Sequence, residues 1–185
     1  DEEAAVLEYT YLDTIKAAGH ACPTVTGAWL CCSEALKKLY PDSTPVRGEI
    51  SVTVYGPADE GVNGVMGQVY SYITGAAPET GFKGLGPKFR RKGLLKYSDE
   101  EVDPQAACFE FGRLDNGRTV LVKFYPWLIP FEPEKAQRVG ELIEKVVIGS
   151  ASPEERRQFQ DLWMEKIEGM IVGRREIDSW LKVEE

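Results

Sequence analysis

The chain has 185 residues, 43% of them hydrophobic, and a formal net charge of −8. This apolar fraction supports a packed core, so the composition excludes global disorder and predicts one domain, or one domain with an appendage. The negative charge argues against nonspecific binding to nucleic acid or to an anionic membrane, because both need a basic surface. No apolar run reaches the about 18 residues of a membrane span, and the acidic first ten residues do not resemble the positively charged start of a secretory leader.

Two helices and a strand are predicted over the first 56 residues. The first helix ends near Gly19, a residue type that commonly stops helices. The second begins at Pro23 and stops at Pro41, and its apolar residues recur at the spacing of one helix face. Residues 48–56, "GEISVTVYG", alternate apolar and polar side chains at Ile50, Val52 and Val54, as a half-buried strand does.

A third helix is predicted over residues 61–75. Gly64, Gly67 and Ser71 form a stripe of small residues along one of its sides. Because glycine destabilises a helix, such a stripe predicts that another backbone or a ligand comes close there.

The second half of the chain predicts a β-hairpin followed by two helices. The hairpin turns at residues 115–117, Asp-Asn-Gly, which supply the positive φ of a tight turn. The last helix opens with a capping box of Ser152 and Glu155. This order of elements predicts an α+β fold. Residues 1–130 would form the core domain, and residues 131–185 a C-terminal helical hairpin and tail packed on the same domain.

His20 and Cys22 stand directly before the second predicted helix. Imidazole nitrogen and thiolate sulfur bind zinc at about 2.0 and 2.3 Å, and a helix N-terminus lowers the pKa of a thiol. Two ligands are too few for a structural zinc site. Two interpretations therefore stay open. The pair has a functional role, as metal ligands or with Cys22 as a reactive thiolate, or it is a buried cysteine beside a hydrogen-bonded histidine. No serine motif accompanies this single histidine, which sets a hydrolase triad aside.

The other three cysteines are predicted to pack in the core. Cys31 lies roughly 13 Å along the helix from Cys22, too far to share one zinc ion with it. Cys32 falls on the apolar helix face, and Cys108 lies within a predicted strand. Adjacent cysteines make a poor disulfide framework, so the reducing cytoplasm is the expected compartment.

A basic, glycine-rich segment spans residues 81–96 of this acidic chain. Four of its basic residues are candidates for anion or substrate binding: Lys83, Lys88, Arg90 and Arg91. Backbone N–H groups and guanidinium forks could hold an anionic ligand there. The alternative is a solvated or edge strand that lysines protect from pairing with another chain. The segment matches neither a Walker motif nor a dinucleotide fingerprint.

Three stretches, in order, resemble one protein family. "GHACPTVTGAW" is similar to the opening of the E-subunit family of tungsten and molybdenum formylmethanofuran dehydrogenase. "GEISVTVYGPADEGVNGVMGQVYSYITG" resembles that family's strand and glycine-bearing second helix, and "VVIGSASPEERRQFQDLWMEKIEGMI" resembles its C-terminal helical hairpin. The resemblance covers most of residues 9–181 and describes a short form without the zinc ribbon that many members carry.

The resemblance implies an α-β-α-β(3)-like core with a mixed sheet, and homodimers. It implies a divalent metal, zinc, at His20 and Cys22. Members often carry a further cysteine where this chain has Glu60, whose carboxylate could supply an oxygen ligand instead. An acidic cap of the following helix is the other interpretation of Glu60. The resemblance also implies a role accessory to molybdenum or tungsten oxidoreductases, with subunits of those enzymes as partners.

Three functions remain open. The first is this metal-binding accessory protein. The second is a metal- or thiol-dependent enzyme in which Cys22 acts on a small anionic substrate that the basic segment holds. The third is a non-catalytic dimeric interaction module, whose C-terminal hairpin makes the contact through Trp163, Met164 and Met170.

Overall fold

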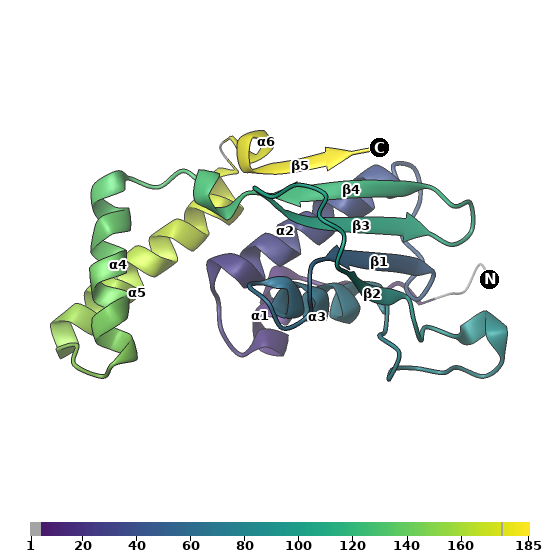
Figure 1. Ribbon diagram of the computed structural model, residues 1–185, viewed down its shortest axis with the longest axis horizontal. Helices are drawn as coiled ribbons and strands as arrows, with labels where there is room; N and C mark the ends of the chain where they lie inside the picture. The colour runs from purple at the N-terminus through teal and green to yellow at the C-terminus, as the bar shows by residue number, and fades with distance from the viewer. Residues whose placement is uncertain (1–4, 175) are drawn as a thin grey trace.

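A five-stranded mixed sheet carries a layer of helices on one face, as seen in a computed structural model that describes residues 5–174 and 176–185 (Figure 1). The strands are β1 (Ile50–Tyr55), β2 (Leu95–Ser98), β3 (Ala107–Arg113), β4 (Thr119–Phe124) and β5 (Leu181–Glu184). The α-helices are α1 (Tyr11–Ala18), α2 (Pro23–Leu39), α3 (Asn63–Thr74), α4 (Pro133–Val147), α5 (Pro153–Glu168) and α6 (Ile177–Trp180). The α+β class and the mixed sheet are confirmed.

The strand order is β2-β1-β3-β4-β5. β1 and β2 are parallel and joined by the crossover through α3, whereas the other three pairs are antiparallel. β3 and β4 form the predicted hairpin. Gly117 in its turn has φ +73°, a backbone conformation that favours glycine.

α2 and α3 run in the same direction, opposite to β1. Arg113, at the end of β3, donates to the carbonyl of Leu39 at the end of α2 (3.0 Å). Gly48, just before β1, donates its N–H to the carbonyl of Thr74 at the end of α3 (2.8 Å). Since Arg113 pairs with the first residue of β1, both helices end beside the start of that strand. Both therefore begin at the end of the sheet where β1 stops.

The core fills the space between the sheet and these two helices. The ring of Tyr70 in α3 meets Phe109 and Phe111 of β3 edge to face, with centroids 5.0 Å apart in both pairs. On α2, Gly27 lies against the ring of Phe124 so closely that an added Cβ would stand 2.5 Å from Cζ. The sequence therefore brings a helix backbone directly onto an aromatic ring of β4.

The small-residue stripe of α3 is explained by two contacts. A Cβ on Gly64 would lie 2.5 Å from the carbonyl oxygen of Ala58, and one on Gly67 would collide with the hydroxyl of Tyr97. The predicted approach of another backbone is confirmed at Gly64. At Gly67 the neighbour is a side chain.

α1 ends at Gly19 as predicted, with φ +78°. It begins at Tyr11 because Thr10 and Asp13 form a reciprocal capping box there. The preceding residues 5–10 are not helical.

α4 and α5 form the predicted helical hairpin, which projects away from the sheet (Figure 1). The capping box is confirmed, because the N–H of Glu155 donates to Ser152 Oγ (3.2 Å) and the N–H of Ser152 donates to Glu155 Oε2 (2.9 Å). Trp163 Nε1 donates to the carbonyl of Ala21 (3.2 Å), which joins α5 to the start of α2. Beyond the hairpin the chain returns to the core, where β5 pairs with β4 as an edge strand that the sequence did not predict.

Candidate functional site

Cys22 is the N-cap residue of α2. Its Sγ accepts the N–H of Val25 at 3.4 Å, so the sulfur lies against the N-terminal end of the helix. His20 is exposed, and its Nδ1 lies 3.2 Å from the carbonyl of Ala18. An N–H at Nδ1 donates to that carbonyl and leaves Nε2 as the ring nitrogen for a ligand.

The three other cysteines are buried free thiols, as predicted. Burial raises the pKa of the Cys31 and Cys32 thiols far above the ordinary value, and raises the pKa of Cys108 to about 11. Cys22 is only half-buried. It is therefore the one thiol in the chain that solvent reaches and that metal or thiolate chemistry can use.

We expect iodoacetamide at pH 8 to modify the native protein once, at Cys22, because only accessible thiolates react and the other thiols are buried and protonated. Intact-mass measurement and peptide mapping report the number and place of the adducts. Cys22→Ser should abolish labelling of the native protein, and labelling in denaturant should reach all four cysteines. Two or more adducts on the native protein would contradict this description of the core.

Glu60 lies in the loop between β1 and α3, at the same end of the helical layer as Cys22. It is exposed and stands two residues before the N-cap of α3, Val62, so it is not the predicted acidic cap. Within residues 5–174 and 176–185, no three His, Cys, Asp or Glu side chains form a group that could hold a metal ion. His20 and Cys22 thus offer a nitrogen and a sulfur donor that suit zinc, but the described residues of one chain do not form a closed four-ligand set.

Arg91 lies apart from His20 and Cys22, against the C-terminal end of α3. Its Cζ stands 3.7 Å from the centroid of the Phe82 ring, as in a cation–π contact. Its side chain also packs on Gly48 and Gly75, the glycine that caps α3 in the left-handed conformation.

The other basic candidates of the segment differ from Arg91 in their surroundings. Lys83 and Arg90 are exposed. The side chain of Lys88 lies outside the described part. β2, which follows, is an edge strand with Lys96 exposed, in keeping with the edge-strand interpretation.

Cys22 and Arg91 lie at opposite ends of the helical layer. Cys22 is the N-cap of α2, whereas Arg91 packs on Gly75, the C-cap of α3. The two helices run in the same direction. The 12 residues of α3 span about 18 Å at 1.5 Å per residue. Among the described residues, the Cys22 thiol and the Arg91 guanidinium therefore stand far apart, at the two ends of this layer.

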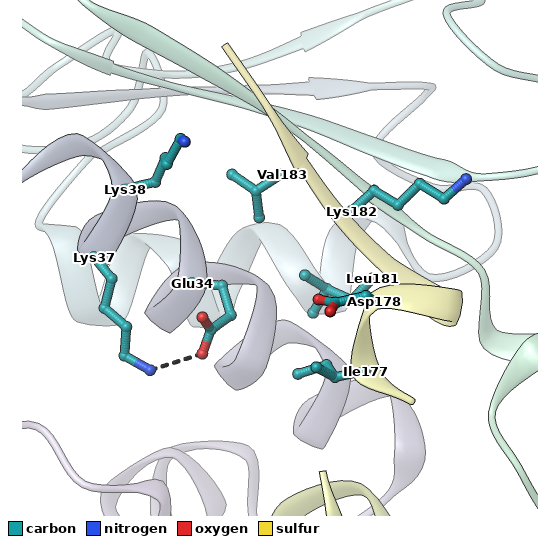
Figure 2. Close-up of a pocket in the computed structure, with 8 residues that line it drawn as sticks. All are labelled: Glu34, Lys37, Lys38, Ile177, Asp178, Leu181, Lys182 and Val183. Atoms are coloured by element: carbon teal, nitrogen blue, oxygen red, sulfur yellow. Dashed lines mark hydrogen bonds and ion pairs between the residues drawn. The ribbon is translucent and has the colours of Figure 1, made fainter. Parts of the chain in front are cut away.

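A cavity of about 490 Å³ lies between α2 and the C-terminal tail, and Figure 2 shows its lining side chains. Its acidic residue on α2, Glu34, is already paired with Lys37 Nζ at 2.7 Å, and also with Arg174 Nη1 at 3.2 Å. The Glu34–Arg174 pair therefore joins the C-terminal tail to α2 beside this cavity.

Neither a protein-family model nor a curated protein matches the chain. The resemblance to the E subunits of formylmethanofuran dehydrogenase therefore rests on the three quoted stretches. Among the helices of the described residues, none combines the length and the apolar character that crossing a membrane requires.

Proposed function

We propose that the protein binds a divalent metal, zinc, at a site built on His20 and Cys22. The observation that supports this proposal best is that Cys22 is the single accessible thiol and sits at the N-terminus of α2, two residues after an exposed imidazole. Imidazole nitrogen and cysteine sulfur are donors that zinc prefers.

A second copy of the chain supplies the other two ligands in this proposal. His20 is exposed and Cys22 half-buried, so both can reach another molecule. A two-fold axis through the metal would join two His–Cys pairs into a tetrahedral set of two nitrogens and two sulfurs. The homodimer would then depend on the metal. Within one chain, Glu60 is the alternative oxygen ligand.

The resemblance to the E subunits of formylmethanofuran dehydrogenase supplies the biological setting of the proposal. It suggests a protein accessory to molybdenum or tungsten oxidoreductase metabolism, with subunits of such enzymes as partners. The described fold is compatible with that role, since α+β class, mixed sheet and C-terminal helical hairpin are the features the resemblance implies.

Elemental analysis and light scattering of protein purified without a chelator or a metal-affinity tag test the proposal. We expect about one zinc ion per two chains and a dimer that EDTA dissociates, because a closed zinc site takes four ligands. His20→Ala combined with Cys22→Ser should give a zinc-free monomer, whereas the buried-cysteine control Cys32→Ala should keep the metal.

Equal zinc content in the wild type and the double variant would refute the site. One zinc per chain, lost on Glu60→Gln, would instead identify the single-chain ligand set.

A further inference from the structure

A second cavity, of about 820 Å³, opens on the side of the molecule where α2 and α3 end. Its walls are residues 5–7 and Tyr9, part of α2, and residues 44–47, with Ile50 and Ile73 also among its lining side chains. This volume falls within the roughly 300–1,000 Å³ of pockets that hold small organic molecules.

Most of the side chains that line this cavity are apolar or aromatic. Trp29 and Leu36 line it from α2, and Tyr9 lines it from the N-terminal segment. The partly exposed Trp29 and Leu36 leave apolar surface in contact with solvent. An apolar ligand body that covered them would gain about 25 cal/mol for each Å² removed from water.

The two charged residues of the lining are both basic, although the whole chain is acidic. Lys37 is already paired with Glu34 at 2.7 Å. Arg47 has no carboxylate partner among the described residues. It donates Nη2 to the carbonyl of Tyr72 (3.1 Å), and its Cζ lies 5.5 Å from the centroid of the Tyr9 ring.

A second guanidinium stands next to Arg47. Around Gly75, an added Cβ would meet Nη1 of Arg91 at 3.1 Å and Nη1 of Arg47 at 3.2 Å, so both cations lie on the same glycine at the end of α3. The carbonyl end of the helix dipole offsets part of their repulsion. An anion between the cavity mouth and this end of α3 would offset more of this repulsion, because it would accept charge-assisted hydrogen bonds from the guanidinium groups.

We propose that this cavity binds an amphipathic organic anion, with its apolar body between α2 and the N-terminal segment and its acidic group on Arg47. Arg91 adds to the positive potential from the other side of Gly75. The site is separate from the His20–Cys22 corner, since it lies at the opposite end of the helical layer.

Two fluorescent probes that differ by one sulfonate group test the assignment. 8-Anilinonaphthalene-1-sulfonate carries the sulfonate, and N-phenyl-1-naphthylamine is the same scaffold without it. We expect the sulfonate to bind the wild-type protein at one site and more tightly than the neutral amine. Arg47→Gln should weaken the sulfonate about tenfold, the effect of one charge-assisted hydrogen bond, and leave the amine unchanged.

Two further variants separate the cavity from the charge. Arg157→Gln, an exposed arginine on α5, is the matched control and should change neither probe. Ser33→Trp places a large side chain in the cavity wall and should weaken both probes. Circular dichroism checks that each variant is folded. Equal affinity for the two probes, or sulfonate binding that Arg47→Gln leaves unchanged, would overturn the proposal.

Discussion

Trp180→Ala is expected to lower the free energy of unfolding by about 3–5 kcal/mol, the usual cost of removing a fully packed tryptophan. The side chain is 1% exposed, and its ring meets Phe124 edge to face with centroids 6.1 Å apart. Its carbonyl also accepts the N–H of Tyr125 at 2.8 Å. Without the indole, α6 and β5 lose the buried contact that holds the tail against the sheet. Urea unfolding followed by circular dichroism measures the effect.

Trp180→Phe is the matched control, with an expected cost of about 1 kcal/mol. A phenyl ring keeps an aromatic contact with Phe124. In addition, the buried Nε1 of Trp180 has no hydrogen-bond partner among the described residues, so its removal takes away a desolvated donor and offsets part of the lost packing. Equal losses for the two variants would contradict this description, because they would mean that an aromatic ring at position 180 adds nothing to the packing of the tail.

The sequence predicted a tail packed on the domain but not the helix and the strand that this tail forms. β5 has four residues and α6 has four, too few to show a helical or a strand period. Both exist because Trp180 and Leu181 bury against the sheet, a tertiary contact that no local pattern encodes. The longer elements, α2 and the β3–β4 hairpin, were predictable because their apolar periods agree with their start and stop residues.

The candidate sites also contain residues that the sequence predicted and residues that it missed. The burial of Cys31 and Cys32 was predicted from their places on the second helix, whereas the sequence left open whether Cys22 is accessible or buried. Arg47 was missed, since it lies in a loop after Pro45 with no motif around it. The fold alone brings it beside Arg91, 44 positions along the chain, where α3 ends. A ligand set or an anion site whose residues come from separate elements forms only through tertiary contacts of this kind.

Gly27→Ala is expected to destabilise the protein by about 1–2 kcal/mol, although alanine is the better helix former. The alanine Cβ would stand 2.5 Å from Cζ of Phe124, a buried ring that cannot move away freely. Overpacking of this kind costs about 1–3 kcal/mol, which exceeds the gain of about 1 kcal/mol in helix propensity. Gly140→Ala, at a helical glycine with nothing within 4 Å of the added Cβ, should keep that gain and stabilise α4.

Phe124→Leu provides the second half of a double-mutant cycle, measured by urea unfolding like the single variants. With the ring gone, Gly27→Ala should become neutral or stabilising, because the smaller side chain leaves room for the Cβ that the ring excludes. A cost of Gly27→Ala that persists unchanged in the Phe124→Leu background would contradict the contact. It would mean that a neighbour other than the Phe124 ring restricts the space for a Cβ at position 27 of α2.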